Sequence, residues 1–196
     1  MAQTSTTLIS AKSHITSITG TDISLSATSG VYTISATSTI LTGAGKLAVG
    51  DLITVSGTSN NNSTFTVSTV VSTLEITVAE VVTSENADGS STITLDHVGF
   101  VSDKAKGDGY YSQPDGVHTV AYQVANDFNA DATIKMQGTL ATTPTEDDWF
   151  DISGTTFTSD TSTLTSSYNF TGNYVWVRSK TQLLTAGTVN SILLNS

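Results

Sequence analysis

Short runs in which apolar and polar residues alternate dominate the chain between residues 21 and 100. The run "TDISLSA" places Ile23 and Leu25 on one side, and "LEITVAE" does the same with Ile76 and Val78. A two-residue period is typical of a strand with one buried face. Similar runs occur in "GVYTISA", "DLITVSG", "STFTVSTV" and "STITLDHV", bounded by Gly, Asn, Asp or Ser. The spacing predicts a small antiparallel barrel or sandwich over residues 21–100.

A second β-rich region covers residues 117–196, where we expect a C-terminal β-sandwich. Its alternating runs include "HTVAYQVAN", "DATIKMQGTL", "DDWFDI", "SSYNFTGNYVWVRSK" and "TVNSILLNS". Both tryptophans, Trp149 and Trp176, fall in this region, and such residues usually fill the space between the sheets of a sandwich. No apolar pattern with a 3.6-residue period extends over ten or more residues, so the sequence predicts almost no helix. The expected fold class is therefore all-β.

Two segments break the strand pattern. Residues 101–116 combine glycines, a proline and alternating charges, which favours a linker between the two regions. A long loop within one sandwich is the alternative. Residues 1–20 are polar with sparse apolar positions, and we interpret them either as an N-terminal arm or first strand that needs a partner to become ordered, or as a frayed terminus.

Serine and threonine account for 64 of the 196 residues, and only 12% of the residues are charged. Thr fits a pleated surface because of its branched Cβ, and neutral hydroxyls keep a sheet face wetted. Apolar residues nevertheless recur at strand spacing throughout, so we expect a folded chain and not a disordered one.

The formal net charge of −10 disfavours partners that carry phosphate, both nucleic acids and anionic membrane surfaces. The absence of Cys excludes disulfides, thiol catalysis and Cys-based zinc sites. The N-terminus has neither a basic region nor a long apolar run, and no stretch is apolar enough to span a membrane. We therefore expect synthesis in a cytoplasm, with release by lysis.

Candidate catalytic residues are few. His14, His97 and His118 lie far apart and in no metal-binding spacing, so a structural role is expected for each. The stretch "DKAKGDG" lacks the order of a phosphate-binding loop, and no G-x-S-x-G motif is present. We predict no enzymatic activity, no catalytic residue, no metal site and no cofactor.

The acidic segment "EDDWFD" leaves alternatives open. Its carboxylates could hold Ca²⁺, although EF-hand spacing is absent, or supply the paired acids of a glycoside hydrolase. A solvated turn before a strand is the simpler interpretation. The residues concerned are Glu146, Asp147, Asp148 and Asp151.

Four tyrosines are candidates for a sugar-binding platform, because an exposed ring can stack on a pyranose face. They are Tyr110, Tyr111, Tyr168 and Tyr174, and a place in the core or on a sheet face is the alternative. A triple asparagine in "SGTSNNNSTF" matches the N-glycosylation pattern, as does "NFT" later in the chain. Asn tolerates left-handed backbone, so we interpret the triple asparagine as a turn between two strands.

Two stretches resemble known virion proteins. The pattern G-D-x-I-x-V-S-G, an Asn-rich turn, T-F-T-V and I-T-V-x-E resembles a small β-domain found in virion structural proteins of tailed bacteriophages. The segment "ATIKMQGTLATTPTEDDWFDI…NFTGNYVWVRSKTQLLTAGTVNSILLN" is similar to a β-sandwich of virion proteins from marine T4-like phages, cyanophages especially. The pattern is carried by residues Gly50, Asp51, Ile53, Val55, Ser56, Gly57, Asn61, Thr64, Phe65, Thr66, Val67, Ile76, Thr77, Val78 and Glu80, with Ser63 where the pattern usually has Gly.

The resemblance implies a non-enzymatic virion protein, and we expect a capsid decoration (cement) protein that coats or stabilises the shell. Its partners would be the major capsid protein or other virion proteins, and its own copies in a homo-oligomer, with a trimer as the first expectation. The arm could add a strand to a neighbouring subunit. The alternative function is a tail, neck or fibre component that contacts the host surface and binds glycan.

Overall fold

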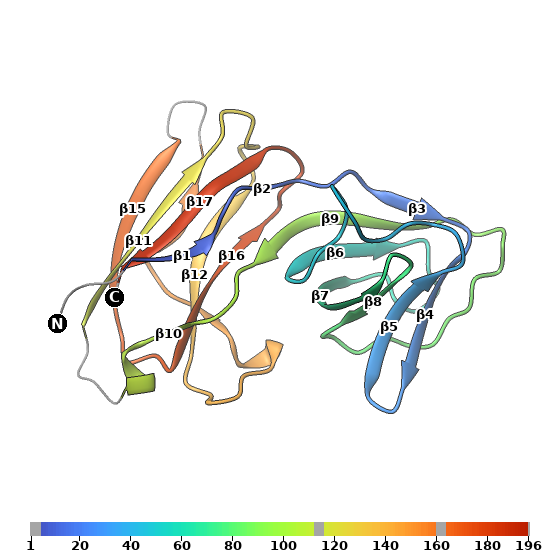
Figure 1. Ribbon diagram of the computed structural model, residues 1–196, viewed down its shortest axis with the longest axis horizontal. Coiled ribbons are helices and arrows are strands. Elements are labelled where there is room, and N and C mark those ends of the chain that lie inside the picture. The colour runs from blue at the N-terminus through green and yellow to red at the C-terminus, as the bar shows by residue number, and fades with distance from the viewer. Residues whose placement is uncertain (1–4, 112–115, 160–163, 196) are drawn as a thin grey trace. The chain divides into compact units, whose positions relative to one another are not determined.

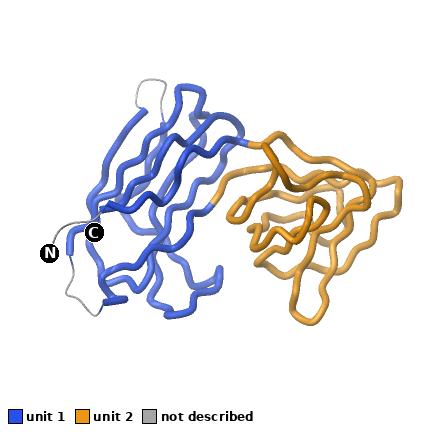
Figure 2. Tube along the Cα trace, viewed as in Figure 1, with its two compact units in different colours: residues 1–14, 101–196 blue, residues 15–100 orange. Residues whose placement is uncertain are grey.

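The computed structural model describes residues 5–111, 116–159 and 164–195. Across these residues the regular elements are strands, apart from two short 3-10 helices, η1 (Asp108–Tyr111) and η2 (Glu146–Asp148). The prediction of an all-β fold with almost no helix is confirmed. The chain forms two compact units (Figure 2): unit 1 contains residues 1–14 and 101–196, and unit 2 contains residues 15–100.

Unit 2 is one antiparallel sheet with the strand order β3-β9-β6-β7-β8-β5-β4 (Figure 1). The long strand β7 changes partner along its length, because Thr66 pairs with Leu52 of β6 whereas Val67 pairs with Val78 of β8. Register shifts accompany this change, and such bulges bend a strand and increase its twist. The strands are β3 (Ile18–Gly20), β4 (Ile23–Thr28), β5 (Val31–Ala36), β6 (Asp51–Ser56), β7 (Thr64–Ser72), β8 (Glu75–Val78) and β9 (Ile93–Val101).

The core of unit 2 lies on the apolar side of this sheet. Alternate residues of each strand point to that side and supply the buried side chains. In β5, Ile34 pairs with Leu25 on one neighbouring strand and with Ile76 on the other, and all three side chains are fully buried. Residues such as Ile53 and Phe65 extend the same core across β6 and β7. Among the described residues β3 and β4 remain the end strands, so the barrel form of the prediction is wrong and the sheet is open.

Unit 1 consists of two antiparallel sheets in a sandwich-like arrangement. One sheet has the order β1-β17-β11-β15, with β2 paired to β17, and the other is built on the β12–β16 pair. Short strands β13 and β14 pair with β12, and β10 pairs with β16. The strands are β1 (Ser5–Ile9), β2 (Lys12–Ser13), β10 (Ala105–Lys106), β11 (Val117–Val124), β12 (Thr133–Thr139), β13 (Phe150–Asp151), β14 (Phe157–Thr158), β15 (Thr165–Thr171), β16 (Trp176–Gln182) and β17 (Thr188–Asn195).

Aromatic and aliphatic side chains from both sheets form the core of unit 1. Tyr122 of β11 is fully buried, its ring lies 6.0 Å from that of Phe157, and its hydroxyl donates to the carbonyl of Thr155 at 2.9 Å. Ile134 of β12 and Ile192 of β17 are fully buried and add aliphatic side chains to this core. A buried tyrosine thus keeps its polar group satisfied while its ring fills the space between the sheets.

Unit 2 ends at residue 100, as the predicted domain does, but it begins at residue 15 and not at 21, and the segments that flank it belong to unit 1. Residues Ser5–Ile9 of the predicted arm pair with β17 of the same chain, so they form part of unit 1 and do not project from it. The predicted linker 101–116 contributes β10 and η1 to unit 1. Its residues 112–115 lie outside the described part of the chain. The chain therefore enters unit 2 from unit 1 and returns to it, an arrangement that a linear reading of the pattern cannot detect.

Candidate functional site

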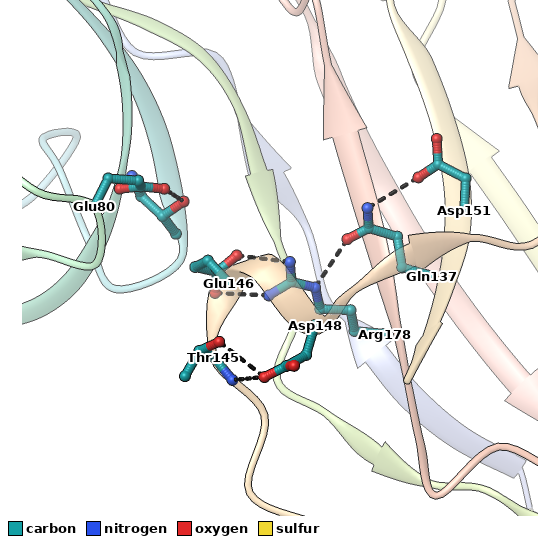
Figure 3. Close-up of polar contacts among 8 residues, drawn as sticks. Glu80, Gln137, Thr145, Glu146, Asp148, Asp151 and Arg178 are labelled. Carbon is teal, nitrogen blue, oxygen red and sulfur yellow. Dashed lines mark hydrogen bonds and ion pairs between the residues drawn. The ribbon is translucent and has the colours of Figure 1, made fainter. Parts of the chain in front are cut away.

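The acidic segment of residues 146–151 lies against β12 and β16, and its carboxylates bind groups of the same chain (Figure 3). Glu146 accepts two hydrogen bonds from Arg178, at 2.9 Å from Nη1 and 2.7 Å from Nη2. The Arg178 Nε donates to Gln137 at 3.0 Å, and the Gln137 amide donates to Asp151 at 2.9 Å. The two hydrogen bonds between Arg178 and Glu146 fix the positions of both side chains. Asp147, the remaining member, is exposed.

Two carboxyls of this segment have lowered pKa values. The backbone and side chain of Thr145 donate to Asp148, at 2.7 and 2.8 Å, and lower the pKa of that carboxyl. Burial alone would raise the pKa of Asp151, but hydrogen bonds from Lys135 and Gln137 and the charges of Lys135 and Lys180 outweigh it. The general acid of a glycoside hydrolase needs a raised pKa, so neither carboxyl suits that role.

Metal binding finds no support in the described ranges, because no three His, Asp or Glu side chains gather there in a way that would hold an ion. Two of the three histidines, His97 and His118, lie beside aspartates. His97 Nε2 lies 3.4 Å from Asp51 Oδ1 in unit 2, and His118 Nε2 lies 3.3 Å from Asp108 Oδ2 in unit 1. His97 Nδ1 accepts the backbone N–H of Ile15 at 3.3 Å, which leaves its ring proton on Nε2, facing the aspartate.

Neither tryptophan fills the core of unit 1, contrary to the expectation from the sequence, because each is half-buried beneath a cation. The Arg178 Cζ lies 4.2 Å from the centre of the Trp149 ring, and the Lys104 Nζ lies 4.5 Å from that of Trp176. The Trp176 indole N–H donates to the carbonyl of Thr142 at 3.0 Å. A half-buried tryptophan can donate its indole N–H to a polar group while the face of its ring contacts a cation.

Aromatic rings and ammonium groups gather around Trp176. The Tyr110 ring lies 4.8 Å from that of Trp176 and 5.2 Å from that of Tyr111. The Lys106 Nζ lies 4.2 Å from the centre of the Tyr110 ring and 5.5 Å from that of Tyr111. Tyr110 and Tyr111 are 42% and 58% exposed, so their rings remain open to a partner. We call Lys104, Lys106, Tyr110, Tyr111 and Trp176 the aromatic–lysine cluster.

Glycines allow the loop that carries the two tyrosines to lie close to β16. Gly107 and Gly109 donate their N–H groups to the carbonyls of Val175 and Tyr174, at 3.0 and 2.8 Å. A Cβ at Gly107 would approach the Tyr174 carbonyl oxygen to 2.4 Å, a distance no side chain tolerates. Asp108 accepts the N–H of Gly116 at 2.6 Å and faces the buried His118, which ties the loop to β11. The cluster is therefore held in place by contacts on both sides.

No protein-family model, no curated protein and no solved structure matches this chain. Within the described ranges no helix has the length and apolar character needed to cross a membrane. The functional inference therefore depends on the geometry of the site and on the resemblance carried by the sequence.

The structure brings two of the four candidate tyrosines together and separates the others. The centre of the Tyr168 ring lies 5.6 Å from that of the core residue Tyr122. Tyr174 lies over Gly138, where an added Cβ would meet its ring at 2.6 Å. From the sequence, Trp176 was expected in the core, and no binding role was assigned to Lys104 or Lys106. The spacing K-x-K-x-x-x-Y-Y in "KAKGDGYY" was the available signal, but Trp176 joins it only through the pairing of Lys106 with Trp176.

Proposed function

We propose that this chain is a non-enzymatic structural protein of a tailed-phage virion, in particular a capsid decoration (cement) protein that binds the major capsid protein. The resemblance of residues 50–80 to a virion β-domain supports this proposal, and the structural roles of those residues carry it. Asp51 is fully buried and accepts the N–H of Ala48 at 2.8 Å. Glu80 accepts both the N–H and the hydroxyl of Thr66 at 2.7 Å.

The other residues of that pattern also build unit 2 and present no reactive group. Gly50 and Gly57 adopt φ values of 86° and 82°, which favour glycine at the ends of β6. Asn61 is 3% exposed, and its amide donates to Thr83 and Glu85 while its oxygen accepts the N–H of Thr83. The pattern thus specifies a folded module, which is what an assembly protein requires. The carboxylates of Glu146 and Asp151, which are held in ion pairs, also support the non-enzymatic proposal.

We expect the protein to act as a homo-oligomer, with a trimer as the first expectation, on the surface of a virion. In unit 1 the outer side of the edge strand β15 has no named strand as a neighbour in the described part of the chain, whereas in unit 2 the backbone of Leu25 in β4 already exchanges two hydrogen bonds with Glu85. An edge such as β15 is able to pair with another subunit. Since Ser5–Ile9 is already paired with β17, we no longer assign intersubunit pairing to the arm.

Particles of the encoding phage that are assembled without this chain provide the test. Purified chain added back to them should bind saturably, sediment with the particles, and appear by cryo-EM at repeated positions of the capsid lattice. The subunit number per site gives the oligomeric state. Particles that bind none of the added chain, or that bind it only at the tail, would contradict the decoration role.

A second candidate function is a tail, neck or fibre component that contacts glycan on the host surface. The observation that favours it is the aromatic–lysine cluster, in which two exposed tyrosines lie beside a tryptophan. Density at the tail or neck in the same cryo-EM experiment would favour this location over the capsid.

A further inference from the structure

Positive charge is concentrated on one side of unit 1. The chain has 17 Asp and Glu residues but only seven Lys and Arg residues, and unit 2 contains a single one of the latter, Lys46. Random placement of so few cations would scatter them over both units. Instead, five of the seven follow the strands β10, β16 and β12, namely Lys104, Lys106, Lys135, Arg178 and Lys180.

The strand register places these cations on one face. Alternate residues of a strand point to the same side, so Trp176, Arg178 and Lys180 share one face of β16. Residues directly opposite in an antiparallel pair also share a face. Lys106 lies opposite Trp176, and Lys135 lies opposite Lys180. The Lys104 ammonium reaches the Trp176 ring from the same side.

Two of the five cations are neutralised by carboxylates and three are not. Arg178 pairs with Glu146 at 2.7 Å, and Lys135 pairs with Asp151 at 2.5 Å. Within the described ranges Lys104, Lys106 and Lys180 form no ion pair. Burial and the nearby charges of Arg178 and Lys135 lower the pKa of Lys180. A negative group arriving on this face would therefore relieve repulsion among like charges.

The exposed rings of the cluster add a second kind of contact beside these cations. Tyr110 and Tyr111 leave about half of their surface in water, at 42% and 58%, although Gly107 and Gly109 fix the loop that carries them. Rings held in this way lose little conformational freedom when a ligand stacks on them. The site combines aromatic rings with ammonium groups within a short patch.

We propose that the aromatic–lysine cluster binds an anionic polysaccharide, with sugar rings stacked on the exposed Tyr110 and Tyr111 and with carboxylate or sulfate substituents paired to Lys104 and Lys106. This inference deepens the second candidate function and does not rest on the capsid assignment. A single-stranded nucleic acid is the competing polyanion. It is disfavoured because the rings meet at 56° and 79°, which offers no parallel stack for successive bases.

Binding of the full chain to polygalacturonate, a carboxylated polysaccharide, tests the proposal, with dextran as the uncharged polymer and oligo(dT) as the nucleic acid. Biolayer interferometry at low salt should detect polygalacturonate and neither of the other two. The variant Y110A/Y111A should weaken this binding roughly tenfold, because it removes both exposed rings on which the sugars stack. The variant K104Q/K106Q should weaken it by a similar factor and reduce its dependence on salt.

The control K12Q/K46Q removes the same amount of charge from residues outside the cluster, so it should leave binding within about twofold of the original chain. Circular dichroism of every variant checks that both units remain folded. Failure to bind polygalacturonate, equal binding of dextran, or equal binding of oligo(dT) would each overturn the proposal. Equal losses in K104Q/K106Q and K12Q/K46Q would also overturn it, because the attraction would then be to net charge alone. None of these outcomes depends on particles, so the capsid proposal is tested separately.

Discussion

The two units are both all-β, but they use charged residues differently. In unit 2 the carboxylates accept hydrogen bonds from turns and strands of the unit itself, as Asp22 does from the N–H groups of Ser38 and Thr39. In unit 1 the cations line one face, where Arg178 and Lys135 are ion-paired and Lys104 and Lys106 lie over aromatic rings.

This difference separates the features that a β-unit needs in order to fold from those that it does not need. Unit 2 has a continuous apolar core and capped turns, and these suffice for a compact sheet. Unit 1 has an equivalent core around Tyr122 and Ile134, yet it also keeps two exposed tyrosines fixed beside lysines. Exposed rings contribute little to folding, so we interpret unit 1 as the recognition unit and unit 2 as a scaffold.

The largest expected effect comes from opening a cavity in either core. Ile34→Ala in unit 2 and Ile134→Ala in unit 1 each remove a fully buried side chain and should cost about 2–5 kcal/mol of unfolding free energy. Both tryptophans lie in unit 1, so fluorescence reports on that unit alone while far-UV circular dichroism reports on both. During urea titration, Ile134→Ala should shift the transition measured by tryptophan fluorescence. Ile34→Ala should leave that transition unchanged and shift only the transition measured by circular dichroism. Identical shifts of both signals in both variants would show that the units unfold as one.

The ion pair of unit 1 gives the next effect. Arg178→Leu leaves Glu146 without its partner and removes the cation from the Trp149 ring. Breaking a buried pair costs about 3–5 kcal/mol, and the 29% exposure of Glu146 places the expected loss near about 3 kcal/mol. Arg178→Lys should recover only a part of this, because an ammonium cannot make the two-pronged contact and the bond to Gln137 together. Full recovery by lysine in thermal unfolding would mean that charge alone matters here.

The triple asparagine provides a smaller effect in unit 2 with a matched control beside it. Asn61→Ala removes three side-chain hydrogen bonds to residues 83–85 and should cost about 1–3 kcal/mol, because buried partners lose their bonds. Asn60 is exposed, and only its backbone contacts Glu85, so Asn60→Ala should change stability by less than about 0.5 kcal/mol. Chemical denaturation followed by circular dichroism measures both. Equal costs would contradict the tethering role of Asn61.

The smallest effect concerns acid. Hydrogen bonds from Thr39, and then from Ser38, hold the pKa of the Asp22 carboxyl well below its ordinary value of 3.8. A lowered folded-state pKa stabilises the fold at pH values above the unfolded pKa, and this stabilisation is lost as the pH falls below 3.8 towards the folded value. Asp22→Asn should therefore lower the unfolding midpoint at pH 7, and the difference between the two proteins should shrink progressively as the pH falls below 3.8 towards the folded-state pKa. A difference between the two proteins that persists unchanged at low pH would exclude this cause.

The sequence predicted the strand-forming segments well, because each has a clear two-residue period. The runs around Ile34, Ile53, Ile76 and Leu95 all became strands with those residues buried. A first strand within residues 1–20 was one of the expectations, whereas the two-residue strands β2 and β10 were missed because they are too short to show a period. Their place in unit 1 depends on pairing with β17 and β16, which lie more than 60 residues away.

The candidate site was predicted only in part for the same reason. Tyr110 and Tyr111 were candidates as aromatic residues, but their neighbour Trp176 comes from a strand far along the chain. The acidic segment looked like a possible ligand site because its partners, Arg178 and Gln137, could not be identified from local sequence. Local pattern predicts elements, whereas the grouping of charged side chains depends on register between distant strands.

The most direct test of the whole account is a cryo-EM map of the particle to which the chain has been added back. We expect density for both units at repeated positions of the capsid lattice, with the aromatic–lysine cluster of unit 1 facing solvent and open to polysaccharide. Absence of the chain from the lattice, or burial of that cluster against the shell, would contradict the division into a scaffold unit and a recognition unit on a virion surface.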